Sequence, residues 1–265
     1  MNPILKALVV FVVCSGSVSY AQEVATTSEP PAPGWVAYHR PNEDERRCAN
    51  YSKQAWTVTL NSDKSGVLIS KYDGGLYRNV IGVRDGRLVG EDNGEWGGGL
   101  WWVSKDGRRR QRLLRRNVYG FVKTSNAVLV ITGLRHMGAN EGDVWRYADR
   151  RGQKKKAEHL VDLGWAPFTF TQDSPDSVLV LTSDGFVRVH DSGRMESLYR
   201  RVYGLLNPDS VAISPSGVIH VGMRHFITRL TPSEGTYKEE FFVPANCTHF
   251  KTDDYDCVCV GPAKH

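Results

Sequence analysis

Residues 205–230, LLNPDSVAISPSGVIHVGMRHFITRL, alternate apolar and polar side chains between three turn-forming clusters. The clusters are Asn207-Pro208-Asp209, Pro215-Ser216-Gly217 and Met223-Arg224-His225. The apolar positions between them are Val211, Ile213, Val218, Val221 and Ile227. Such alternation between turns is typical of half-buried antiparallel strands. The stretch therefore predicts two strands and the start of a third.

Weaker copies of this unit precede it along the chain. The expected third strands contain Trp101, Trp145, Val187 and Thr228, and turns of the type KDG, RRG, DSG or SEG follow them. Successive copies are about 40 to 45 residues apart, which is the length of a four-stranded propeller blade. The first copy predicts strands at 56–60, 67–70 and 76–80.

This period predicts an all-β fold, a β-propeller of about five four-stranded blades. A sixth blade is the alternative if residues 35–48 begin another unit. No stretch has the periodicity of an amphipathic helix, so none is expected.

The N-terminal region has the pattern of an exported protein. Residues 1–21 resemble a signal peptide, with Lys6, a short apolar run and small residues before Gln22. The run is too short to span a bilayer, so the chain is not expected to be membrane-spanning. Residues 22–34 are polar and Pro-rich and predict a flexible leader. Residues 35–265 predict a single propeller domain with a disulfide-linked C-terminal tail, located in the periplasm or secreted.

Four cysteines follow the predicted signal peptide: Cys48, Cys247, Cys257 and Cys259. An even count in an exported chain predicts two disulfides, for which three pairings exist. Cys257 and Cys259 are separated by one residue, a poor geometry for a mutual bridge. We therefore expect Cys48 to pair with Cys257 or Cys259 and a local bridge to form in the tail. A metal site that includes His249 is the alternative.

The stretch PDSVAISPSGVIHVG (208–222) resembles the NHL and gluconolactonase-like group of six-bladed propellers. GLWWVSKDGR and FVRVHDSGR also look like the third strand and turn of that group. In its lactonase members the Asp of this motif coordinates a divalent metal, and the matching residue is Asp209. Ser210 and Ser214 depart from the motif, and Trp165-Ala166-Pro167 stands where an Asn ligand is expected. The resemblance thus implies, as the alternative function, a lactonase or related hydrolase that uses a divalent metal such as calcium.

Long loops between second and third strands are expected on the upper face of a propeller, together with the links between blades. EDNGEWGGG (91–99) and RHMGANEGD (135–143) are the longest and should be adjacent in space. Such loops on a rigid scaffold commonly bind ligands. The candidate ligand-binding residues are Glu95, Trp96, His136, Asn140, Glu141, Asp143, Trp165, Asp209, Arg224 and His225. The competing interpretation is that these are ordinary solvated loop residues.

No nucleophile has a supporting motif, since Gly-x-Ser-x-Gly and His-Glu-x-x-His are both absent. The favoured function is therefore an exported, non-catalytic propeller that binds a protein or a carbohydrate through its upper face, without a cofactor.

Basic residues gather in two turns that are expected on the lower face. They are Arg108, Arg109, Arg110, Arg112, Lys154, Lys155 and Lys156. Charge on outer strands discourages edge-to-edge pairing, but clustered charge also attracts anionic surfaces. Contact with an anionic surface is therefore a hypothesis. A net charge of +5 on an exported chain without a recognised binding module does not favour nucleic acid.

Overall fold

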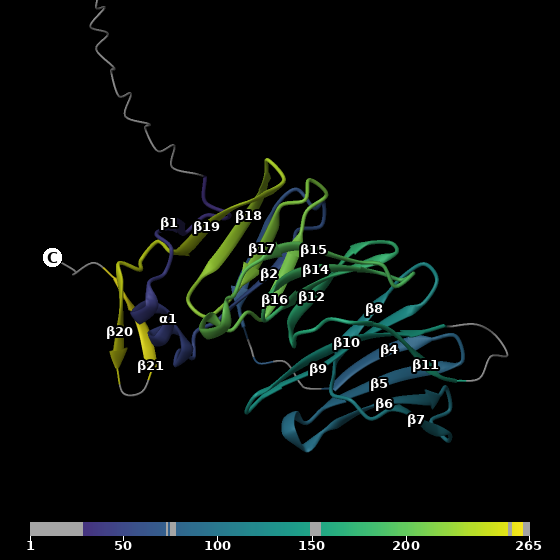
Figure 1. Ribbon diagram of the computed structural model, residues 1–265. Helices are drawn as coiled ribbons and strands as arrows, with labels where there is room; N and C mark the ends of the chain where they lie inside the picture. The colour runs from purple at the N-terminus through teal and green to yellow at the C-terminus, as the bar shows by residue number, and fades with distance from the viewer. Residues whose placement is uncertain (1–28, 73, 75–77, 149–154, 254–255, 262–265) are drawn as a thin grey trace, which may run out of the picture.

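The structure, a computed structural model, describes residues 29–72, 74, 78–148, 155–253 and 256–261 (Figure 1). The predicted signal peptide (1–21), residues 22–28 of the predicted leader and Lys154 lie outside the described residues. The described chain is built almost entirely from antiparallel strands, as the sequence predicts.

Three sheets of four strands follow chain order, so that each strand pairs with the next. The first contains β4 (Arg78–Val83), β5 (Gly86–Asp92), β6 (Gly98–Ser104) and β7 (Arg110–Leu114). The second contains β8 (Val118–Lys123), β9 (Val128–His136), β10 (Ala139–Tyr147) and β11 (Ala157–Asp162). The third contains β12 (Pro167–Ser174), β13 (Ser177–Thr182), β14 (Gly185–His190) and β15 (Met195–Arg200). This meander is the strand order of a propeller blade.

The strands of residues 205–230 lie in a five-stranded sheet. Its chain-ordered part is β16 (Ser210–Ile213), β17 (Ile219–Gly222), β18 (Ile227–Ser233) and β19 (Thr236–Pro244). The fifth strand is β1 (Trp35–Tyr38), which pairs antiparallel with β19. Residues 35–38 therefore complete the last sheet, which differs from the alternative in which they begin a sixth blade.

The first predicted unit contributes only two strands, β2 (Trp56–Leu60) and β3 (Val67–Lys71). Its expected third strand was assigned to the wrong unit, because β4 pairs with β5 across a tight turn and so begins the next sheet. The β2–β3 hairpin lies beside the five-stranded sheet: the Val58 N–H donates to Ser210 Oγ at 2.9 Å. The first and last units of the chain are thus neighbours, as in a propeller ring.

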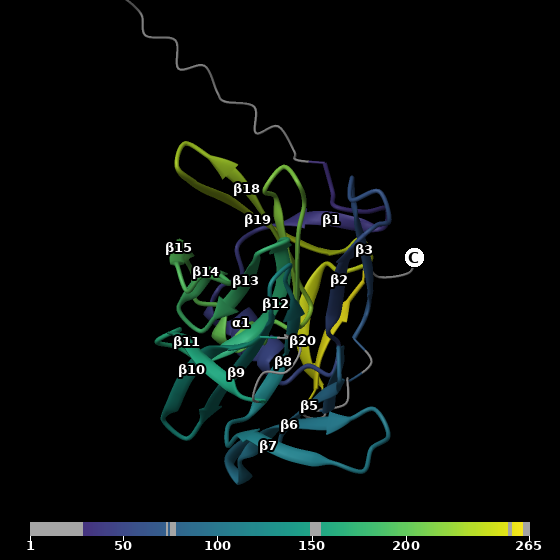
Figure 2. The same cartoon turned by 90° about the vertical axis from the view of Figure 1, so that its right-hand side faces the viewer.

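The sheets succeed one another in reverse chain order, from the β16–β19 sheet to the β4–β7 sheet (Figures 1 and 2). Buried Val, Leu and Ile side chains of adjacent sheets pack between them. The first strands of neighbouring sheets, β8 and β12, approach each other closely. A Cβ atom on Gly120 would lie 2.5 Å from Phe170 Cζ, so a larger residue would force the Phe170 ring to move.

A short helix, α1 (Glu43–Asn50), was not expected from the sequence. It has only eight residues and buries only Ala49 among them, so it has no apolar periodicity to detect. The signal that marks it is the capping box of Asn42 and Glu45, in which each side chain accepts the other residue's backbone N–H.

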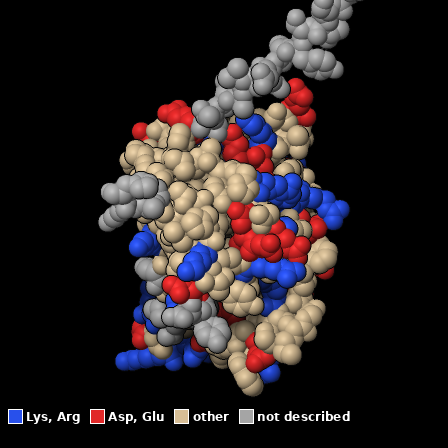
Figure 3. Space-filling view, turned by 90° about the vertical axis from the view of Figure 1, so that its left-hand side faces the viewer, with Lys and Arg blue, Asp and Glu red and all other residues tan. Residues whose placement is uncertain are grey.

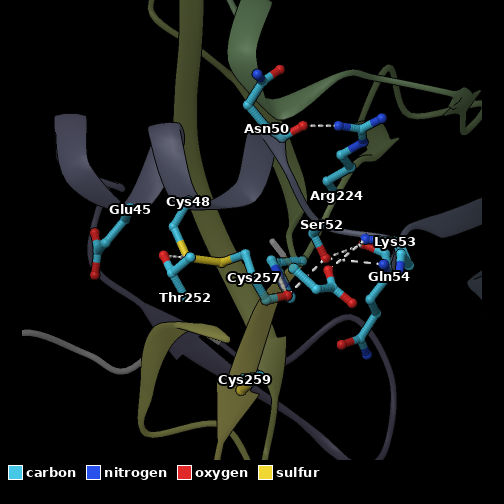
Figure 4. Close-up of a disulfide and its surroundings, with 12 residues drawn as sticks. Glu45, Cys48, Asn50, Ser52, Lys53, Gln54, Arg224, Thr252, Cys257 and Cys259 are labelled. Carbon is cyan, nitrogen blue, oxygen red and sulfur yellow. Dashed lines mark hydrogen bonds between the residues drawn. A yellow bond between two sulfur atoms is a disulfide. The ribbon is translucent and has the colours of Figure 1, made fainter. Parts of the chain in front are cut away.

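The predicted disulfide pattern is confirmed. Cys48 of α1 is bonded to Cys257 of the C-terminal hairpin, which is formed by β20 (His249–Asp253) and β21 (Asp256–Val260) (Figure 4). Cys247 and Cys259 form the local bridge. These bonds attach α1 and the hairpin to each other as one cap on the β16–β19 sheet. Figure 3 shows this side of the molecule, where acidic and basic side chains are interspersed.

The ordered chain reaches back beyond the predicted domain start. Ala32 packs with Trp35 and Trp56 in a buried cluster, and the Ala245 N–H donates to the Gly34 carbonyl at 2.8 Å. Ala32 and Gly34, which fall within the predicted leader, therefore contact the folded sheets. No helix among the described residues has the length and apolar character needed to cross a membrane.

Candidate functional site at the upper loops

The two segments predicted to be neighbouring loops do meet at one end of the sheets, but the expected long loop 135–143 is wrong: β9 ends at His136 and β10 begins at Ala139, so only two residues form the turn. The short 3-10 helix η1 (Gly94–Trp96) lies between β5 and β6, and a tight turn joins β9 to β10. Glu95 Oε2 and His136 Nε2 are 2.6 Å apart and link the two loops across neighbouring sheets. Both side chains are somewhat less than half exposed, so this ion pair holds loop position and adds little stability.

The backbone of each loop is fixed locally. The Asp92 carboxylate accepts the Gly94 N–H at 2.9 Å, and Asn117 Nδ2 donates to the Gly94 carbonyl at 2.7 Å. In the other loop, Met137 and Gly138 have φ values of 44° and 94°. Two positive φ values in a two-residue hairpin match a type I′ turn, which usually has Asn or Gly at the first position. Met137 is therefore held in a conformation that is unfavourable for its residue type.

These loops present two large apolar side chains to solvent. Trp96 is 85% exposed and Met137 is 92% exposed. They follow directly after Glu95 and His136, the two residues that the 2.6 Å contact brings together. Trp96 and Met137 are therefore two exposed apolar side chains on contacting loops, here called the apolar tip, and neither belongs to the core.

The polar candidates on β10 are engaged by neighbouring residues. Asn140 Oδ1 accepts hydrogen bonds from the Ala166 N–H at 2.9 Å and from Ser183 Oγ at 2.6 Å. This side chain therefore attaches β10 to the next sheet. Trp165, which precedes that attachment, is 44% exposed beside it.

The carboxylates of β10 form ion pairs along the same edge. Glu141 Oε1 lies 2.9 Å from Arg116 Nη1, and Asp143 Oδ1 lies 3.0 Å from His159 Nε2. Asp143 also lies 3.9 Å from Arg116 Nε. Glu141 and Asp143 thus carry paired charge on β10, the strand that follows the Met137 turn, rather than free carboxylates.

Asp209 lies apart from these loops, in a pocket of about 570 Å³ at the foot of α1. The pocket is lined by Asn50, Lys53, Tyr72 and Arg224, among other residues. Asp209 Oδ1 accepts from Ser210 Oγ at 2.9 Å, whereas Oδ2 is buried without a hydrogen-bond partner among the described residues. Burial raises the pKa of Asp209 to about 7, although the hydrogen bond from Ser210 and the charge of Arg224 oppose that shift.

Calcium does not fit this pocket. Asp209 is the single carboxylate among the described residues that line it, and the cationic side chains of Lys53 and Arg224 line it as well. Calcium requires six to eight oxygen ligands, several of them usually carboxylates. In the part of the chain that the structure describes, no three His, Cys, Asp or Glu residues are grouped for a metal ion.

His225 lies beneath the cap, whereas Arg224 is partly buried, lines the Asp209 pocket and contacts the end of α1. The Arg224 guanidinium donates to the Asn50 carbonyl at the end of α1 (Figure 4). His225 is 1% exposed, and one of its ring nitrogens donates to the Cys257 carbonyl at 2.8 Å. Burial lowers the pKa of His225, which favours the neutral ring. The missed helix explains this placement, because α1 and the disulfide-linked hairpin cover the loop that contains both residues.

Neither protein-family models nor curated proteins match this chain. Similar solved structures include regucalcin of Agrobacterium tumefaciens, described as a calcium-binding protein, with 13% identity, TM-score 0.44, and coverage of 71% of this chain and 74% of that one. Another is the extracellular domain of a one-component system of B. thetaiotaomicron, with 14% identity, TM-score 0.44, and coverage of 69% of this chain and 27% of that one. A third is virginiamycin B lyase of Staphylococcus aureus, with 14% identity, TM-score 0.38, and coverage of 70% and 69%.

The similar structures thus include gluconolactonase-like and related propellers, the group that residues 208–222 resemble. The chain covers 27% of the length of the one-component system chain.

Proposed function

We propose that this chain is an exported, non-catalytic propeller that captures a protein partner through its upper loops. The observation that carries the proposal is the apolar tip of Trp96 and Met137, exposed on two loops that an ion pair holds together. Large aromatic side chains dominate the energy of protein interfaces, and Met adapts to partner surfaces of varied shape. The paired charges of Glu141 and Asp143 supply a polar rim.

The scaffold in this proposal has five units, in which β2–β3 is the first and the β16–β19 sheet is the last. Export is supported by the two disulfides, because such bonds persist in oxidising compartments. A protein partner is favoured over a carbohydrate because carbohydrate sites combine an aromatic platform with free polar groups. Around this tip, the Asn140 amide oxygen and the Asp143 carboxylate are already engaged.

The double variant Trp96→Ala/Met137→Ala tests the proposal. We expect the immobilised wild-type chain to retain a discrete protein from the periplasmic or secreted fraction. The double variant should retain at least about tenfold less of it, since truncating two hot-spot residues costs roughly 2–4 kcal/mol. The matched control is Met195→Ala, which removes a Met that is 42% exposed on β15. Equal retention by all three proteins would overturn the proposal, and loss of glycan binding instead would establish the carbohydrate alternative.

A further inference from the structure

A groove of about 1030 Å³ lies away from the upper loops, where two sheets meet. One wall is the β6–β7 turn, residues 104–109, and the other is the segment that leads into β11. The cationic residues that line it are Lys105, Arg108, Arg109, Arg110 and Lys155. Two carboxylates, Asp85 and Asp106, line it as well. The groove is therefore basic, and its positive charge comes from both sheets.

Both carboxylates are committed to the protein. Asp106 accepts from Ser104 Oγ at 2.5 Å and from the Arg108 N–H at 3.1 Å, so it stabilises the turn. Asp85 pairs with Lys155 Nζ at 2.7 Å and thereby joins the two walls. Among the residues that the structure describes, the guanidinium groups of Arg108 and Arg109 form no ion pair. These two cations remain available to a ligand.

Aromatic rings contact three of the cations that line the groove. The Arg109 guanidinium lies 5.6 Å from the Trp102 ring centre, and Lys155 Nζ lies 5.4 Å from the same ring. Next to the groove, Arg110 stacks on Trp101 at 3.9 Å. Trp102 is 5% exposed, so its ring is a fixed platform on the groove floor. Lys155 also pairs with Asp85 and Arg110 with Glu91 at 2.8 Å, so among the described residues Arg109 is the ring-positioned cation without an ion pair, and its charge is available to a ligand.

We propose that this groove binds an extended polyanion that carries phosphate or sulfate groups. Guanidinium groups donate two parallel hydrogen bonds to such tetrahedral oxyanions. The groove is open along the junction of two sheets, so a linear chain can place successive charges near Arg108 and Arg109 and run on past the Lys155–Asp85 pair. Phosphate and sulfate share this chemistry, and the experiment below distinguishes them.

A membrane surface fits the groove less well than a soluble chain does. Binding to a bilayer commonly combines basic residues with exposed apolar anchors. None of the large apolar side chains that are exposed in the described part of the chain lines this groove. The simpler explanation, that the arginines only protect the outer strand β7 from pairing, does not account for the Lys155 of another sheet that faces them.

The test is the double variant Arg108→Ala/Arg109→Ala, measured by fluorescence anisotropy with two labelled probes, a polyphosphate of defined length and a heparin-derived oligosaccharide. We expect at least a tenfold loss of affinity for the preferred probe. We also expect a shallower dependence of affinity on salt concentration, because fewer counterions are released from the polyanion. The control is Arg200→Ala/Lys238→Ala, which removes the same charge from side chains that are 77% and 63% exposed elsewhere.

Stronger binding of polyphosphate or of the sulfated probe would identify the preferred oxyanion. Equal losses in both double variants would show a general charge effect and would contradict the proposal, as would the absence of binding to either probe. Vesicles containing phosphatidylglycerol form a further arm. Binding to these vesicles through Arg108 and Arg109, without binding to either soluble probe, would also overturn the proposal.

Discussion

At the scale of single residues, Asp209 differs most from what the sequence indicated. The resemblance to gluconolactonase-like propellers implied a metal ligand. The structure instead provides a buried carboxyl group in a pocket that Lys53 and Arg224 also line, and one of its oxygens has no hydrogen-bond partner among the described residues. Sequence reasoning correctly placed Glu95 near His136, because loops at equivalent positions of neighbouring units must meet. It could not place His225, since its partners Cys257 and Phe250 come from the C-terminal hairpin, which is distant in sequence.

The buried Asp209 predicts a pH-dependent stability. Its pKa is about 7 in the folded chain, above its ordinary value of 3.8. The folded state therefore binds a proton more tightly than the unfolded state, and stability falls as pH rises from the ordinary pKa through 7. We expect Asp209→Asn, which keeps an acceptor for Ser210 Oγ, to stabilise the protein, and to do so more at pH 8 than at pH 5 by about 1–3 kcal/mol. Urea unfolding at the two pH values measures this, and an equal effect at both would show that burial does not perturb Asp209.

At the scale of elements, the hairpins of the later units were largely predictable, and the ends of the chain were not. Strand β13 contains a continuous apolar run, and β14 mixes Phe and Val with Arg188 and His190; turn residues bound both, which is a pattern that sequence reading detects well. The partner of β1 is more than 190 residues away, at β19, and local sequence does not specify such a pairing. Helix α1 is stabilised by its capping box and by the bond from Cys48, so its sequence carries little hydrophobic signal.

The two disulfides predict different contributions to stability. The bond between Cys48 and Cys257 spans a sequence separation of 209 residues, whereas that between Cys247 and Cys259 spans 12. In the chain-entropy model, removing the first by Cys48→Ala/Cys257→Ala costs about 5 kcal/mol, and removing the second by Cys247→Ala/Cys259→Ala costs about 3 kcal/mol. Chemical unfolding of both variants measures the difference. A smaller loss for the long-range bond would show that the cap is dispensable for joining the chain ends.

At the scale of the whole molecule, the chain separates two surfaces of different chemistry. The upper loops present Trp96 and Met137, and the groove between the β4–β7 and β8–β11 sheets presents Arg108 and Arg109. The same two sheets carry both surfaces. The propeller-like scaffold thus allows one partner to be held at the upper loops while a polyanion occupies the groove. Because the surfaces share no lining residue, variants of one should leave binding at the other unchanged. Trp96→Ala/Met137→Ala should keep its affinity for the polyanion probes, and Arg108→Ala/Arg109→Ala should retain the protein partner.

The central claim is that the upper loops form the partner-binding surface, and site-specific photo-crosslinking tests it most directly. A benzophenone-bearing residue is placed at position 96, at position 137, or at position 195 on β15, and the protein is irradiated in the periplasmic or secreted fraction. The account predicts the same protein adduct from positions 96 and 137 and none from position 195. Adducts of equal yield from all three positions, or from position 195 alone, would contradict it.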